Sequence, residues 1–346
     1  MTDNVTNTID PEQLMTNVTP VDCPICQSHA WLKRLMPATR NMKGASGKHR
    51  TFQDPEVCIS LCRKCGLVVE DGIYSDEYYQ QFFAGYYMDN PQNYEWSDKW
   101  KADQRLSILA PLLTGKPETI LEIASATGAN LDFFRQTYGS RLCVGVEPIV
   151  EYVEYSNDKF PEITVSNSRW EDYSSGNSFD LIIAGFCVGH FNHPLSAFSK
   201  IRDALDDKGI FYLDDGGNPL HFFKNKKASL TRTLLTSEKR FYYTPETLTR
   251  MLTKVGFDIV VNGEYDDPTR GASDSALYFV CRKAGPIPEV KFQDWVHGQK
   301  VLQEFRLAKM RILRQNIKKP RFWLSPFWHM IPGPLREWAL RQITRR

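Results

Sequence analysis

The sequence has no long hydrophobic run. Its longest apolar stretches, such as 181–184 and 259–261, are far shorter than the roughly 20 residues that a membrane-spanning helix needs. The N-terminal segment lacks a basic region followed by an apolar stretch, so no secretory signal is visible and a cytoplasmic location is expected. No internal repeat is present. The chain is instead divided by its local patterns.

Excess charge is also lacking, since the formal net charge is only +2. Residues 285–346, however, contain 13 Lys and Arg against 4 Asp and Glu, whereas the preceding residues contain 30 and 37. The body is therefore acidic and the C-terminal segment basic. With 346 residues, 42% of them hydrophobic, the chain is long enough for roughly two domains with an ordinary core.

Four of the eight cysteines form two Cys-x-x-Cys pairs, Cys23 with Cys26 and Cys62 with Cys65. Each pair places two thiolates on one tight turn, and the 35 intervening residues can bring the turns together. This pattern predicts a structural zinc site. The intervening loop contains a modest basic cluster, which we interpret as solvated, so no nucleic-acid partner is expected.

The chain is expected to have five regions. Residues 1–20 are polar and predicted to be a disordered leader. Residues 21–70 contain the zinc-ribbon-like module, residues 71–101 an aromatic linker that lines the substrate, residues 102–284 the main domain, and residues 285–346 a helical extension.

Strands and helices alternate through residues 102–284, which predicts a parallel, doubly wound α/β sheet. Strands are expected at 119–124, 142–146, 163–165, 179–184, 209–213, 257–262 and 276–281. Helices are expected at 102–113, 131–138, 149–159, 195–205 and 245–255.

A nucleotide-binding pattern follows the first two of these strands. Glu122 lies near the end of the first strand, and the turn after it consists largely of small residues, among them Ala124, Ser125, Ala126 and Gly128. Glu147 ends the second strand, where its carboxylate can accept both ribose hydroxyls. A dinucleotide would need nearly the same layout. The Glu122 carboxylate, however, would repel a pyrophosphate but suits the cationic methionine end of S-adenosylmethionine.

The motifs at 121–128, 144–148 and 179–190, with Phe241 to Leu248, resemble those of class I S-adenosylmethionine-dependent methyltransferases. The resemblance implies a Rossmann-like seven-stranded sheet, with Gly185 and Phe186 beneath the sulfonium. Ala124 and Ala126 replace two usual glycines, so we expect slightly altered cofactor contacts. Arg169 stands where many relatives have an adenine-binding acid, so Trp170 is expected to stack on the adenine.

The paired cysteines, the aromatic bridge and this domain together resemble the sugar C-methyltransferase family. That resemblance implies a nucleotide-linked sugar or glycan acceptor and a zinc module beside the substrate. Arg240 replaces the family's basic histidine and cannot accept a proton. We therefore expect O-methylation, with C- or N-methylation of a small metabolite, or a non-catalytic or nucleic-acid-binding adaptor, as alternatives.

A methyltransferase must also remove a proton from a hydroxyl or carbon acceptor. His190 is the first candidate base because it follows the loop expected under the methyl donor, and His221 and Tyr87 are further candidates. Lys239 and Arg240 are expected to bind an anionic group of the substrate. Tyr86 and Tyr242 are expected to line its pocket.

The basic C-terminal segment has apolar residues at helical spacing, which predicts a helix over 299–317. Residues 320–331 mix aromatic residues with prolines, and 335–346 are expected to form a short basic helix. Aromatic and basic residues together suit a peripheral contact with the inner face of a membrane. Packing on the chain's own domain or on a dimer partner is the preferred interpretation.

Overall fold

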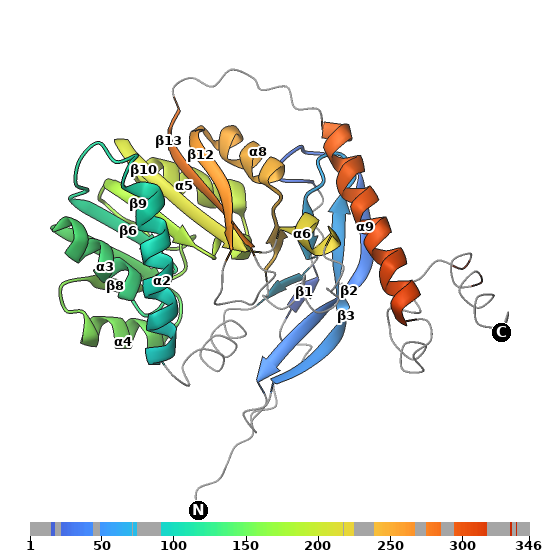
Figure 1. Ribbon diagram of the computed structural model, residues 1–346, viewed down its shortest axis with the longest axis horizontal. Helices are drawn as coiled ribbons and strands as arrows, with labels where there is room; N and C mark the ends of the chain where they lie inside the picture. The colour runs from blue at the N-terminus through green and yellow to red at the C-terminus, as the bar shows by residue number, and fades with distance from the viewer. Residues whose placement is uncertain are drawn as a thin grey trace, which may run out of the picture.

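The computed structural model describes residues 15–17, 22–43, 49–70, 72–74, 91–216, 218–224, 239–266, 275–284, 294–316, 333 and 337. Within these residues the strands form a seven-stranded sheet, a four-stranded sheet and a two-stranded sheet. The large sheet with its helices and the long strands of the N-terminal part lie side by side, and a long C-terminal helix flanks the latter (Figure 1).

The large sheet has the strand order β12-β13-β10-β9-β6-β7-β8. Its strands are β6 (Thr119–Ile123), β7 (Leu142–Glu147), β8 (Thr164–Asn167), β9 (Phe179–Gly185), β10 (Leu205–Gly216), β12 (Phe257–Asp266) and β13 (Ser275–Lys283). All seven predicted strands are present. The prediction of a parallel sheet is wrong for β13, which pairs antiparallel with both β10 and β12. The reason is the connection from β12 to β13, which is too short for the crossover that a parallel pair requires.

Helices cover both faces of this sheet, because successive strand residues point to opposite sides. One apolar cluster joins the strands to α2 (Pro91–Leu109), α3 (Ala129–Tyr138) and α4 (Val150–Lys159). The other joins them to α5 (Pro194–Ala204) and α8 (Pro245–Val255). The predicted helix at 102–113 is thus the last part of a longer helix that starts at Pro91.

The start and end of α8 follow directly from its sequence. Thr244 accepts a hydrogen bond from the Thr247 amide and the Thr247 hydroxyl accepts one from the Thr244 amide, which forms a capping box. Pro245 occupies the first turn, where no amide donor is needed. Gly256 ends the helix with φ 101°, a left-handed conformation that favours glycine.

The four-stranded sheet has the order β11-β4-β3-β2 and joins the cysteine-containing region to the main domain. Its strands are β2 (Trp31–Lys43), β3 (His49–Cys62), β4 (Val68–Glu70) and β11 (Phe241–Tyr242). The prediction that residues 1–20 form a disordered leader is wrong for β1 (Met15–Asn17), which pairs with β5 (Gly72–Tyr74). Backbone pairing with a distant strand, which local composition does not reveal, orders these residues.

Helix α9 (Asp294–Asn316) confirms the predicted helix over 299–317, although it starts five residues earlier. It packs on the second cysteine turn. A Cβ atom at Gly298 would lie 2.2 Å from the carbonyl oxygen of Arg63, and one at Gly66 would lie 2.8 Å from the Val301 side chain. The helix predicted at 335–346 lies outside the described residues, apart from residue 337. Within the described part of the chain, no helix is long and apolar enough to cross a membrane.

Candidate functional site

The loop between β6 and α3 has the backbone of a glycine-rich turn. Ala124 and Ala126 have φ angles of 56° and 46°, and Gly128 has φ 75°. The left-handed region is costly for residues with a Cβ atom, by roughly 1–2 kcal/mol each. Hydrogen bonds hold the loop: the Ala124 amide donates to the Val146 carbonyl at 2.7 Å and the Ala126 amide to the Glu147 carboxylate at 2.9 Å. The two alanines therefore retain the conformation of the glycines they replace.

Gly128 cannot be replaced by a larger residue as readily. A Cβ atom there would lie 2.9 Å from the Ile163 side chain and 3.0 Å from the Ser156 hydroxyl. That hydroxyl donates to the carbonyl of Ala126 at 3.0 Å. Helix α4 thereby packs directly against the loop and leaves space for glycine alone.

The Glu147 carboxylate is buried at the end of β7 and bridges two backbone segments. It accepts hydrogen bonds from the amides of Ala126 at 2.9 Å and Ile149 at 3.0 Å, one to each oxygen. A carboxylate at the end of the second strand is the group expected to accept ribose hydroxyls. This geometry fits the ribose of S-adenosylmethionine.

Ser125 lies in the same loop, between Ala124 and Ala126, but its side chain points toward the sheet. It is 2% exposed, and a Cβ atom at Gly145 would lie 2.5 Å from its hydroxyl. The contact expected between Ser125 and the cofactor can therefore involve only its backbone.

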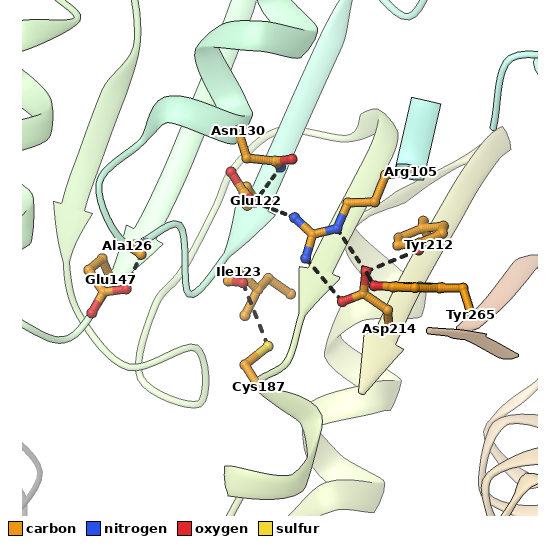
Figure 2. A network of polar contacts seen from close by, with 10 residues as sticks. All are labelled: Arg105, Glu122, Ile123, Ala126, Asn130, Glu147, Cys187, Tyr212, Asp214 and Tyr265. Atoms are coloured by element: carbon orange, nitrogen blue, oxygen red, sulfur yellow. Dashed lines mark hydrogen bonds and ion pairs between the residues drawn. The ribbon is translucent and has the colours of Figure 1, made fainter. Parts of the chain in front are cut away.

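A buried polar network lies at the ends of β6, β9 and β10 (Figure 2). The Asn130 amide donates to Glu122 at 2.5 Å, and the Arg105 guanidinium is 3.7 Å from the same carboxylate. Arg105 also binds Asp214 with two hydrogen bonds of 2.8 and 3.0 Å. The hydroxyls of Tyr212 and Tyr265 donate to Asp214. One guanidinium thus lies between two carboxylates from different strands.

This network keeps its charges despite complete burial. Burial disfavours the charged form of Arg105, but the Asp214 carboxylate outweighs it and raises the pKa of Arg105 above its usual value. Burial likewise opposes ionisation of Asp214, yet Arg105 and the two tyrosine hydroxyls lower the pKa of its carboxyl. The residues therefore form a charged, hydrogen-bonded unit at neutral pH.

Gly185 ends β9 and Phe186 follows it, beside the same network. A Cβ atom at Gly185 would lie 2.0 Å from the Arg105 guanidinium, so a glycine is needed for Arg105 to reach its position. Phe186 has φ 57° and donates its amide to the Asp214 carbonyl at 2.8 Å. The Lys101 ammonium lies 5.1 Å from the Phe186 ring centre. Arg105 and Asp214 could not be predicted from the sequence, because no motif connects a helix before β6 with a strand after β9.

Trp170, which was expected to stack on the adenine, is buried inside the protein. It is 3% exposed, donates its indole N–H to the Ala197 carbonyl at 3.0 Å, and has the Lys200 ammonium over its ring at 5.1 Å. Tyr173 lies beside it, with ring centres 6.1 Å apart. The stacking contact with adenine stays a prediction, and in this structure the indole packs in the core beside α5.

The segment 239–242 was expected to bind the substrate, but its side chains bind the protein. Lys239 pairs with Asp215 and donates to the Gly216 carbonyl at 2.7 Å, and Arg240 donates to the Asn192 carbonyl at 2.9 Å. Tyr242 is 1% exposed and donates to Glu70 at 3.0 Å. The expected substrate roles of all three stay predictions. These side chains connect β11 to the end of β10 and to β4.

The three candidate bases have different positions. His190 lies half-buried in η2 (Val188–His190), directly after the loop that follows β9. His221 lies in α6 (Pro219–Lys224), 2.7 Å from the Ser275 hydroxyl and 2.8 Å from the Glu264 carboxylate. Tyr86 and Tyr87 lie outside the described residues. His221 thus contacts a hydroxyl through one ring nitrogen and a carboxylate through the other.

The four predicted zinc ligands come together. All four sulfur atoms lie within 4.8 Å of one another, with 3.5 Å between Cys23 and Cys65 and 3.6 Å between Cys26 and Cys62. A tetrahedral zinc with Zn–S bonds of about 2.3 Å requires S···S separations of roughly 3.8 Å. Hydrogen bonds among the four thiols lower the pKa values of Cys26 and Cys62 and raise those of Cys23 and Cys65, so the four groups share their protons. The donor set therefore fits zinc.

Comparison with known proteins agrees with the geometry of the main domain. Residues 96–262 match a family model described as a methyltransferase domain. No curated protein matches the sequence. The match supports the predicted methyltransferase and covers α2 through most of β12.

Solved structures of methyltransferases are also similar to the chain. The glycopeptide N-methyltransferase MtfA is 13% identical, with 54% of this chain and 90% of that chain covered and a TM-score of 0.42. The plantazolicin methyltransferase BpumL in complex with SAH is 14% identical, with 56% and 87% covered and a TM-score of 0.44. The N-methyltransferase NodS from Bradyrhizobium japonicum WM9 is 14% identical, with 57% and 99% covered and a TM-score of 0.42.

Proposed function

We propose that the protein transfers a methyl group from S-adenosylmethionine to a hydroxyl group of a sugar, a nucleotide sugar or a surface-glycan precursor. The observation that carries the proposal is the loop between β6 and α3, which keeps a glycine-rich conformation at Ala124 and Ala126 and is tied to the ribose-binding carboxylate of Glu147.

Several residues of the described chain would hold the cofactor. The Glu147 carboxylate would accept the ribose hydroxyls, and the backbone of residues 124–128 would lie against the nucleoside. Glu122, held by Asn130 and near Arg105, supplies negative charge for the ammonium group of the methionine end. When bound, S-adenosylmethionine supplies an electrophilic methyl group.

The proposal of a sugar acceptor rests on the resemblance to the sugar C-methyltransferases. O-methylation is preferred over C-methylation because Arg240 replaces the histidine that the resemblance requires and is fixed on the Asn192 carbonyl. A hydroxyl acceptor still needs a group that takes its proton.

Two measurements test this function. Calorimetry with S-adenosylmethionine should show one site per chain, whereas an adaptor that uses the sheet only as a scaffold need not bind it. Incubation with methyl-labelled cofactor and a panel of nucleotide sugars and glycans should then give a labelled O-methyl product. Transfer only to RNA or protein would refute the sugar proposal.

We also propose that the four clustered cysteines hold a structural zinc ion. The cluster lies in the core that it shares with α5 and α8, and the Lys254 ammonium donates to the carbonyls of Pro24 and Ile25 at 3.1 and 3.0 Å. Metal analysis of the purified chain should find one zinc per molecule. Cys26→Ser should lose that zinc, whereas Cys143→Ser, outside the cluster, should retain it.

The peripheral membrane contact of the basic C-terminal segment is a further proposal. It rests on the aromatic and basic composition of residues 320–346. Co-sedimentation with vesicles containing phosphatidylserine, with and without these residues, tests it. Equal binding of the two forms would exclude the contact.

A further inference from the structure

Three side chains from separate segments form a hydrogen-bonded series. The Ser275 hydroxyl lies 2.7 Å from Nδ1 of His221, and Nε2 of the same ring lies 2.8 Å from a carboxylate oxygen of Glu264. Ser275 begins β13, Glu264 lies in β12 and His221 lies in α6. A hydroxyl, an imidazole and a carboxylate in this order form the arrangement that activates a hydroxyl oxygen in many enzymes.

The carboxylate determines the direction of the hydrogen bonds. An ionised Glu264 can only accept, so Nε2 of His221 must carry the proton that it donates. In the neutral ring Nδ1 then has a lone pair and accepts from the Ser275 hydroxyl. The imidazole is therefore oriented to take a proton from Ser275.

Asn218 supports this arrangement from the start of α6. Its side-chain amide donates to the other oxygen of Glu264 at 3.2 Å, and its side-chain carbonyl accepts the Leu220 amide at 3.0 Å. One residue thus fixes both the carboxylate and the helix that carries His221. The His221 and Glu264 side chains are 39% and 33% exposed, so solvent-borne groups can reach them.

The series lies at the same edge of the sheet as the cofactor residues, on the opposite side of the strand reversal. Ala276, next to Ser275, pairs with Gly216 at the carboxyl end of β10, and Glu264 pairs with Leu277. The cofactor residues follow β6 and β7, and the strand order reverses between β6 and β9. Ligands bind at the carboxyl ends of strands near such a reversal. The half of the edge formed by β10, β13 and β12 is thus the half available to the methyl acceptor.

We propose that Ser275, His221 and Glu264 form a proton relay that deprotonates a hydroxyl group of the methyl acceptor; this inference rests on the proposed function. The acceptor O–H gives its proton to the Ser275 oxygen while the Ser275 proton passes to Nδ1 of His221, and Glu264 stabilises the resulting imidazolium. The acceptor oxygen forms its bond to the methyl carbon, the carbon–sulfur bond breaks, and its electron pair stays on sulfur.

The activation of Ser275 can be measured without any acceptor. Diisopropyl fluorophosphate added to the full-length protein should modify Ser275, since the activated oxygen forms a bond to phosphorus, fluoride leaves and the proton goes to His221. Peptide mass spectrometry gives the rate. We expect His221→Asn to lower that rate by about 100-fold or more and Glu264→Gln by about 10-fold. The exposed Ser199 in α5 serves as the internal control and should remain unmodified.

Methyl transfer provides the second readout. With an acceptor found in the sugar panel, Ser275→Ala should lower kcat by roughly 100-fold and leave the affinity for S-adenosylhomocysteine unchanged in calorimetry. Ser199→Ala and Glu154→Gln, both exposed on other helices, should retain full turnover. Unmodified Ser275, a modification rate that is unchanged in His221→Asn, or full turnover of Ser275→Ala would overturn the relay.

The outcomes also separate the relay from the proposed function. A wild-type protein that binds no S-adenosylmethionine but is modified at Ser275 would refute the methyltransferase and retain the activated serine. A protein that methylates a sugar with Ser275 unmodified would refute the relay and retain the methyltransferase.

Discussion

The two halves of the large sheet's carboxyl edge are built in different ways. At β6 and β7 the site consists of backbone groups from one short loop, fixed by hydrogen bonds to Glu147 and Val146. At β10, β13 and β12 it consists of side chains from segments far apart in the sequence, such as His221 with Ser275 and Lys239 with Asp215. A single invariable ligand suits the first half. The second half can be changed residue by residue, as a variable acceptor requires.

Arg105 connects these halves, since it contacts Glu122 on β6 and Asp214 on β10. The substitution with the largest expected effect on stability is therefore Arg105→Met, which removes the cation between two buried carboxylates. We expect the free energy of unfolding to fall by about 3–5 kcal/mol, measured by urea denaturation. Arg141→Met removes an exposed pair with Glu118 and should cost less than about 1 kcal/mol. Equal losses would show that Arg105 does not connect the halves.

Glu147→Gln tests the cofactor half alone. The substitution removes the charge and one acceptor oxygen from a position that holds Ala126, Ile149 and, in our proposal, the ribose. Affinity for S-adenosylhomocysteine should fall about 10- to 100-fold, which corresponds to roughly 1.4–2.7 kcal/mol. Calorimetry measures this, with the exposed Glu154→Gln as the matched control. An unchanged affinity would remove Glu147 from the cofactor site.

The pH dependence of stability tests the charge of Asp214, the carboxylate on β10 that Arg105 contacts. Because the native pKa of Asp214 is lowered, the unfolded chain binds more protons around its ordinary pKa of about 3.9. The contribution of the Asp214 carboxylate to the free energy of unfolding is then fully present above about pH 3.9 and is lost as the pH falls through the lower native pKa. The difference in urea midpoint between wild type and Asp214→Asn should shrink below about pH 4. Asp203→Asn, at an exposed residue, is the matched control.

The predictable parts of the molecule are those in which neighbours in sequence act together. The strands of the large sheet, the loop at 121–128 and the two cysteine turns each carry their own pattern, and the structure brings Cys23, Cys26, Cys62 and Cys65 to one point. Helix α2 was placed too late because its first residues have no apolar periodicity.

The unpredictable parts depend on long-range contacts between side chains. Lys239 was expected to bind an anionic group of the substrate, and its pairing with Asp215 and the Gly216 carbonyl in the core has no local signal. Trp170 was expected to stack on the adenine, and its hydrogen bond to the Ala197 carbonyl of α5 had no local signal. His221 was a candidate base from its place after a strand, but its partners Ser275 and Glu264 had no local signal at all.

The smallest expected effect concerns the strain in the cofactor loop. Ala124→Gly and Ala126→Gly each relieve a left-handed alanine, worth roughly 1–2 kcal/mol, but add unfolded-state entropy of about 0.5–1 kcal/mol. Each should therefore raise the free energy of unfolding by about 0.5 kcal/mol, whereas Ala110→Gly, at an exposed residue without positive φ, should lower it by a similar amount. Differential scanning calorimetry of the three variants measures the sign. A loss of stability in Ala124→Gly would mean that the Ala124 methyl group packs favourably against the protein. The loop would then retain alanine for that contact, and not merely tolerate a methyl group beside the nucleoside.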